Sequence, residues 1–108
     1  RFSDFNQIFN ASLPLRIITK DFEVVSVNDT YIRLFQLYKD EIIGKKCYNP
    51  DLKRLGHNCN SNNCSMKQIE LGKEFYEYEL SSKLPDGSII VNIIHSVPYK
   101  DAKGNFAG

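Results

Sequence analysis

The sequence predicts an α+β fold in which a five-stranded antiparallel sheet carries short helices on one face. Two strands rich in Ile and Val, residues 15–20 and 22–28, meet at a junction too short for a crossover, which favours a hairpin. Several short helical segments follow. Two further strands, 75–82 and 88–99, then flank a Pro-Asp-Gly turn. Strands, then helices, then strands are typical of an antiparallel sheet covered on one side.

Length and charge exclude several classes of function. The 108 residues, 42% of them hydrophobic, predict one soluble domain with a single core. The net charge is +1 and Lys and Arg form no stripe, so we expect no nucleic-acid partner. No apolar run approaches the roughly 20 residues that cross a bilayer, so we expect no membrane contact from these residues. Because the sequence begins at Arg1 without Met, we expect it to be a piece of a longer protein.

The first twelve residues predict a leading amphipathic helix. Its apolar face consists of Phe2, Phe5, Ile8 and Phe9. A helix this short is not stable alone, so it must pack on its own sheet or on a second copy of the chain. Both alternatives are open.

The segment 27–45 predicts a helix over 29–37 that the rest of the chain surrounds. Asn28 is placed to accept the free N–H groups of the first turn, and Asp29 adds negative charge at the positive end of the helix dipole. Apolar residues three and four apart give the helix one buried face. A short helical turn at 39–43 follows, and Gly44 permits a sharp turn after it.

The second half of the chain predicts a loop, a helix and three strands. Residues 46–63 lack periodicity and read as a loop with one helical turn at 52–55, and the helix 65–71 directs Met66 and Ile69 inward. Strand 75–82 alternates Tyr and Leu with Glu and Ser, as a half-buried strand does. After strand 88–99 and a turn at 101–104, residues 105–107 begin a last strand that the end of the sequence truncates.

These segments together resemble a PAS domain. The resemblance is carried by Val27-Asn28 before the helix, Glu41-Ile42-Ile43-Gly44-Lys45 after it, Leu84-Pro85-Asp86-Gly87-Ser88, and Val97-Pro98 with Asp101 and Gly104. It covers the chain from Phe5 to the end, with a departure at Gln36, where many members have Gly. The resemblance implies one PAS-like sensory domain over residues 1–108, belonging to a larger signalling protein such as a two-component sensor histidine kinase. It also implies a homodimer through the leading helix, and phosphoryl transfer in another domain of the same parent chain.

Three cysteines lie in the irregular segment: Cys47, Cys59 and Cys64, with His57 nearby. They could be ordinary reduced thiols, a disulfide or redox pair, or ligands of zinc or an iron–sulfur cluster. His57 and Cys59 are close together for two ligands of one ion, and no Cys-x-x-Cys pair supports a metal. All three possibilities stay open.

Flavin and haem are not expected. The run 56–59 resembles the flavin-adduct motif of light-sensing PAS domains, but the Asn- and Ser-rich run 60–63 replaces the flavin-contacting residues. His95 continues the face of Ile89, Val91 and Ile93, so we expect it to point into the domain as a hydrogen-bonded core residue rather than a haem ligand. We therefore expect no cofactor, with a metal or iron–sulfur cluster as the open alternative.

A small-molecule pocket, if the domain has one, should combine apolar walls with a few polar groups. The polar groups would be Tyr76, Tyr78 and His95, and the walls would be Ile18, Val27, Ile32, Phe35, Ile69 and Ile93. Each of the apolar residues fits a plain core position better than a pocket wall.

No catalytic motif is visible, so we expect this fragment not to be an enzyme. Three functions compete: a small-ligand sensor, a thiol or metal redox sensor that uses Cys47, Cys59 and Cys64, and a purely structural dimerisation module. We expect a cytoplasmic location for all three.

Overall fold

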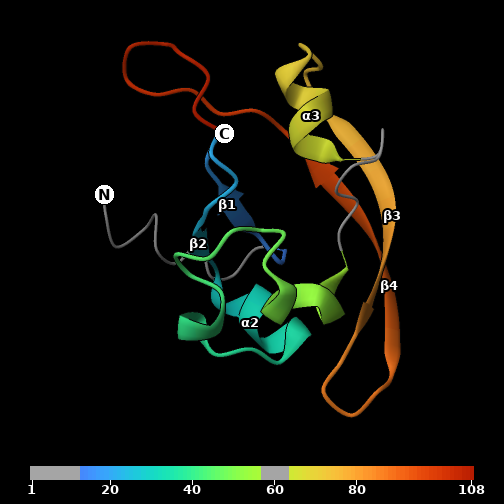
Figure 1. The fold of residues 1–108 in the computed structure, drawn as a ribbon. Coiled ribbons are helices and arrows are strands. Elements are labelled where there is room, and N and C mark those ends of the chain that lie inside the picture. The colour runs from blue at the N-terminus through green and yellow to red at the C-terminus, as the bar shows by residue number, and fades with distance from the viewer. Residues whose placement is uncertain (1–12, 57–63) are drawn as a thin grey trace.

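The computed structural model describes residues 13–56 and 64–108. The elements in order are β1 (Arg16–Ile18), β2 (Val24–Val27), α2 (Asp29–Phe35), the 3-10 helices η1 (Lys39–Glu41) and η2 (Pro50–Leu55), α3 (Ser65–Glu70), β3 (Tyr76–Lys83) and β4 (Ile89–Ser96) (Figure 1). This order confirms the predicted succession of strands, helices and strands. The expected leading helix lies outside the described residues.

Strands β1 and β2 form the predicted antiparallel hairpin, with Arg16 opposite Val27. The turn closes where the Thr19 N–H donates to the Glu23 carbonyl and the Phe22 N–H donates to the Thr19 carbonyl. Phe22 takes a positive φ of 68° there. The pairing register shifts between Ile17 and Ile18, and such irregularities bend a strand.

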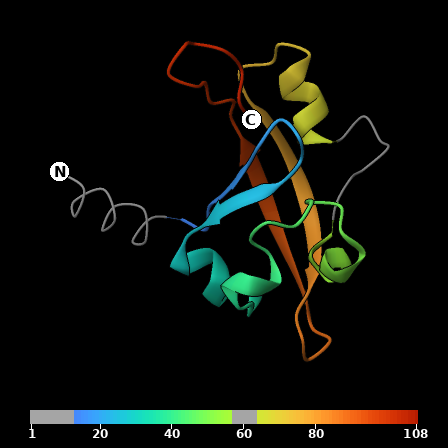
Figure 2. The same cartoon turned by 60° about the vertical axis from the view of Figure 1, so that its left-hand side comes forward.

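Strands β3 and β4 form a longer antiparallel ribbon, from Tyr76 opposite Ser96 to Lys83 opposite Ile89. In its turn the Asp86 carboxylate accepts hydrogen bonds from the N–H and the hydroxyl of Ser88. These bonds lower the pKa of Asp86, because they favour its ionised form. The twisted ribbon forms one side of the molecule in Figure 1, and in Figure 2 it runs through the middle of the view.

The expected single sheet of five strands is not confirmed, because the described strands form two sheets of two strands each. The C-terminal residues nevertheless connect the two. Tyr99 exchanges hydrogen bonds with Ala107 and Gly108, and the Lys20 N–H donates to the Ala107 carbonyl at 2.8 Å. Phe106 pairs with Lys100 as an isolated bridge. Residues 106–108 thus join the end of β1 to the chain after β4, over a length too short for a strand.

The main core lies between β2, α2 and the two 3-10 helices. It consists of Val24, Val27, Tyr31, Phe35, Leu37, Ile42, Leu52 and Leu55. Residues 44–47 cover the free edge of β2: the Gly44 N–H donates to the Val24 carbonyl, and the Cys47 N–H donates to the Phe22 carbonyl. Gly44 has φ +82°, as the predicted sharp turn requires.

Helices η2 and α3 both contact β3. Gly56, after η2, lies so close to β3 that a Cβ there would be 2.5 Å from the Ser81 carbonyl oxygen. The buried Ser82 hydroxyl donates to the Leu55 carbonyl across the same contact. Met66 and Ile69 of α3 are buried, which confirms their predicted inward direction.

Candidate functional site

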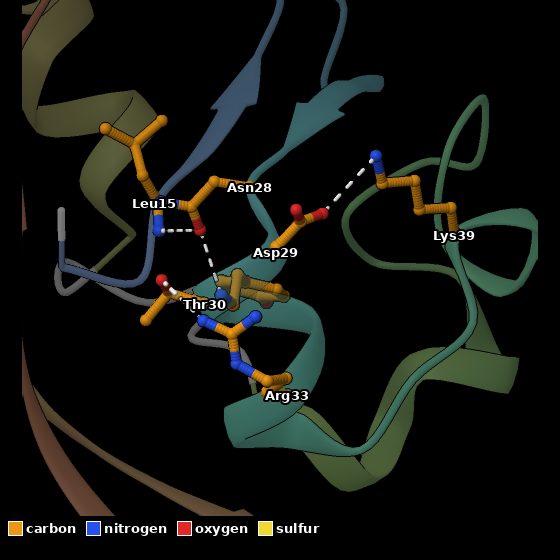
Figure 3. A network of polar contacts seen from close by, with 7 residues as sticks. Leu15, Asn28, Asp29, Thr30, Arg33 and Lys39 are labelled. Atoms are coloured by element: carbon orange, nitrogen blue, oxygen red, sulfur yellow. Dashed lines mark hydrogen bonds and ion pairs between the residues drawn. The ribbon is translucent and has the colours of Figure 1, made fainter. Parts of the chain in front are cut away.

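Asn28 fixes the start of α2 against the segment before β1 (Figure 3). Its Oδ1 accepts from the N–H of Tyr31 at 2.9 Å and from the N–H of Leu15 at 3.0 Å, and its Nδ2 donates to the Leu13 carbonyl at 2.8 Å. Asn28 has no exposed surface, so its bond to Tyr31 forms away from water, whereas the bonds to Leu15 and Leu13 are part-buried. The predicted helix cap is confirmed, and the same side chain also positions the entry to β1.

The ends of α2 are fixed by weaker, exposed contacts. Asp29 lies 3.7 Å from the ammonium of Lys39, and Arg33 donates to the Thr30 hydroxyl at 3.4 Å (Figure 3). At the C-terminal end, Gln36 takes the left-handed conformation with φ 54°. Gln36 therefore occupies the conformation for which many PAS domains use Gly, and the helix ends at the expected place.

The structure brings together most of the apolar residues predicted for the pocket. Val27 and Phe35 belong to the buried core, and Ile18 and Ile32 pack against it. The Phe35 ring lies 4.5 Å from that of Tyr31. Ile69 is buried on α3, and Tyr76 and Tyr78 lie half-buried on the side of β3 that α3 contacts. That these side chains bind a ligand stays a prediction.

The expected inward direction of Ile93 and His95 is wrong. Ile93 is 65% exposed, and the His95 side chain is 55% exposed. The pairing register explains the difference, because it places Ile93 opposite Glu79 and His95 opposite Glu77, on the outer face of the ribbon. His95 stacks on Phe75 with ring centroids 5.5 Å apart, and its Nδ1 lies 3.7 Å from the Glu77 carboxylate.

Sequence reasoning missed Arg16, a half-buried charged residue that lies opposite the buried Val27 in the first hairpin. The Arg16 and Tyr31 side chains are hydrogen bonded, which unites β1 with α2. Burial by itself lowers the pKa of the guanidinium, but the surrounding Tyr31, Tyr78 and Cys47 outweigh burial and the pKa of Arg16 is raised. The sequence did contain one sign of this residue: Arg16 is a basic residue within the otherwise apolar run Leu15-Arg16-Ile17-Ile18.

Tyr31 remains a neutral phenol in this setting. Burial raises the pKa of Tyr31, and the Arg16 guanidinium only partly opposes that effect. A cation and two tyrosines, Tyr31 and Tyr78, therefore face one another across β1, α2 and β3.

The cysteines are placed only in part. Cys47 is half-buried against the core, and Cys64 is half-buried directly before α3. The described residues contain no group of three potential metal ligands. His57 and Cys59 lie outside the described residues, so the metal and redox alternatives stay predictions.

A surface hollow of about 390 Å³ lies between η2 and the ends of β3 and β4 near their turn. It is lined by Lys53, Arg54, Ser81, Ser82, Lys83 and Ile89, none of which was predicted as a site residue. Arg54 is fixed beside it by hydrogen bonds to the carbonyls of Lys83 and Gln36, at 3.0 and 3.1 Å.

Within the described ranges, no helix has the length and apolar character that spanning a membrane requires.

The comparisons with known protein families and with solved structures all match PAS domains. The model of the PAS domain matches residues 13–108, nearly the whole chain. No curated protein gives a significant match.

Solved structures share the fold at low sequence identity. The PAS domain from Bordetella pertussis BvgS is 15% identical with a TM-score of 0.63, and the match covers 98% of this chain and 76% of that one. The PAS domain of an HTR-like protein from Haloarcula marismortui is 14% identical with a TM-score of 0.70, over 98% and 84%. A PAS domain from a two-component sensor histidine kinase is 13% identical with a TM-score of 0.68, over 98% and 89%.

Proposed function

The chain belongs to the PAS domain family, and from that membership we propose that it is the sensory module of a two-component sensor histidine kinase. PAS domains are generally non-catalytic sensory modules, so the kinase activity and phosphorelay would reside elsewhere in the parent chain. A PAS domain of similar fold comes from a protein of that class, which supports the proposal. We propose a cytoplasmic location, where thiols such as Cys47 and Cys64 stay reduced.

The sensed signal would be a small molecule held between the β3–β4 ribbon and the helices. One observation carries this proposal: the side of the ribbon that faces the helices is only partly buried. Tyr76, Tyr78, Ile90, Asn92, Ile94 and Ser96 all keep accessible surface there, and only Leu80 and Ser82 are fully buried. A ligand in this region would be bound by apolar walls and a few polar groups, as small molecules usually are. No resident cofactor is part of the proposal.

Signal relay would use packing between two copies of the chain. The outer face of β4 supports this, because Ile89, Val91 and Ile93 on it, and Val97 directly after it, are exposed by 56% to 65%. A contiguous patch of exposed apolar residues is typical of a surface that binds another molecule. A second copy would cover this face together with the leading residues Phe2, Phe5 and Phe9, and ligand binding would shift the packing.

We also propose that residues 106–108 begin the fifth strand of one continuous sheet. Their hydrogen bonds to Lys20 on one side and to Tyr99 on the other support this arrangement. In that arrangement a ligand-dependent change in one ribbon would reach the other through the backbone.

The sensory proposal is tested by native mass spectrometry of the protein purified without chelator. We expect a small molecule to accompany the folded protein. A protein without any bound small molecule, which also fails to bind any in a metabolite screen, would contradict the sensory proposal.

The dimer proposal is tested by Ile93→Glu, which places a charge in the exposed apolar face. We expect the solution mass to fall from that of a dimer to that of a monomer, because a buried unpaired carboxylate opposes association. Lys53→Glu, a charge change in the surface hollow, is the control and should leave the dimer intact. A wild-type protein that is already a monomer at high concentration would exclude this mode of relay.

A second candidate function is thiol redox sensing through Cys47. The positive charge of Arg16 acts on Cys47, and a nearby cation favours the reactive thiolate form of a cysteine. Thiol titration and metal analysis would separate this function from ligand sensing. Three slowly reacting thiols and no stoichiometric metal would exclude the redox, zinc and iron–sulfur alternatives together.

A further inference from the structure

Arg16 is a half-buried charge that forms no ion pair with the described residues. The ion pairs between described residues join Lys39 to Asp29, Lys45 to Asp51 and His95 to Glu77, and none includes Arg16. Its polar neighbours are Tyr31, Tyr78 and Cys47. A desolvated charge is costly unless an opposite charge or several hydrogen bonds compensate it.

Within residues 13–56 and 64–108, no acidic residue supplies an anion to Arg16. Every acidic residue in the described ranges is exposed except Glu23 and Asp29. Asp29 pairs with Lys39 at the protein surface. Glu23 alternates with the buried Val24 and so shares the outward face of Val25, which is 41% exposed.

A second polar group in the same region lacks a partner. The Nδ2 atom of Asn92 is buried and makes no hydrogen bond in the described part of the structure. Asn92 lies opposite Leu80 on β4, and Tyr78 lies opposite Ile94, so Asn92 and Tyr78 are diagonal neighbours on one face. A buried donor without an acceptor indicates that something absent from the protein chain accepts its hydrogen.

We infer that the interior bounded by β1, α2 and the β3–β4 ribbon binds a small organic carboxylate, with the Arg16 guanidinium as counter-ion and the Asn92 amide as second donor. This inference rests on the proposed ligand-sensing function and names the class of ligand. A carboxylate matches the planar fork of a guanidinium and can accept further bonds from Asn92 and from the Tyr78 hydroxyl.

The test compares carboxylates with their neutral amides. Wild-type protein freed of co-purified molecules is titrated with acetate, propionate, succinate and benzoate, and with acetamide, propionamide, succinamide and benzamide, at constant ionic strength. Calorimetry and thermal unfolding report binding. We expect at least one acid to bind at least tenfold more tightly than its amide and to raise the unfolding temperature with saturation.

Variants identify the groups that bind. Arg16→Met should weaken the acid at least tenfold and leave the amide unchanged, because it removes the charge and keeps the apolar stem. Arg33→Met is the matched control, since Arg33 is exposed on α2 and should bind like the wild type. Asn92→Leu should weaken the acid while leaving the empty protein as stable as before or more so, since it replaces an unsatisfied donor with an apolar group of similar size.

Three results would overturn the inference. They are acids and amides that bind equally, an Arg16→Met variant that keeps the wild-type preference for the acid, and a wild-type protein that binds none of the four acids. If the amides bind and the acids do not, ligand sensing stands and the carboxylate inference falls. If neither set binds and no molecule accompanies the purified protein, the sensory proposal falls as well.

Discussion

At the scale of single residues, Asn28 has the largest expected effect on stability. Asn28→Ala leaves the buried N–H of Tyr31 and the part-buried N–H of Leu15 and carbonyl of Leu13 without their side-chain partner. We expect the free energy of unfolding in urea to fall by about 2–4 kcal/mol. Asn49→Ala removes one exposed cap bond of η2 and should cost about 1 kcal/mol or less. Equal losses for the two variants would contradict the role given to Asn28.

Tyr31 should make stability depend on alkaline pH. Its pKa in the folded protein is raised above the ordinary value of 10.0, chiefly by burial. Above pH 10 the unfolded chain therefore loses the phenolic proton while the folded protein keeps it. Folded protein then binds more protons, so stability falls as the pH rises from 10 towards the folded pKa.

Urea unfolding at pH 9, 10 and 11 checks this dependence. Tyr31→Phe should show a smaller fall across that range than the wild type. Tyr38→Phe is the control, because Tyr38 is 77% exposed, and it should follow the wild-type profile. A Tyr31→Phe profile parallel to that of the wild type would show that Tyr31 does not titrate differently in the two states.

At the scale of elements, the two faces of β4 should differ in their tolerance of substitution. Ile90 packs against the core cluster, whereas Ile89 is 58% exposed on the opposite face. We expect Ile90→Ala to cost about 1–2 kcal/mol in chemical denaturation, and Ile89→Ala about 0.5 kcal/mol or less. The reverse order of losses would mean that the strand faces the other way in solution.

The direction of β4 also shows where sequence patterns stop being informative. Both faces of the run Ile89-Ile90-Val91-Asn92-Ile93-Ile94 are apolar, so alternation does not say which face is inside. The pairing register decides, because Ile93 lies opposite Glu79 and a one-residue shift would reverse both faces. Strand β3, by contrast, alternates tyrosine with glutamate, and its inner face was predicted correctly.

At the scale of the whole molecule, the fold class was predictable and the interior chemistry was not. Asn28, the tight first hairpin and the Asp86-Gly87 turn act locally, so the sequence reveals them directly. The grouping of Arg16 with Tyr31 and Tyr78 depends on how three elements from distant parts of the chain meet. The spacing of residues in the sequence does not show which distant elements come into contact, and this is why Arg16 and Asn92 were missed.

The short connection through residues 106–108 has a mechanical consequence. Two peptide groups, those of Ala107 and Gly108, carry the backbone bonds that join the β1–β2 hairpin to the chain following β4. We expect a molecule that changes the spacing of the two hairpins to act on these backbone bonds, so that their state reports whether the space between the hairpins is filled.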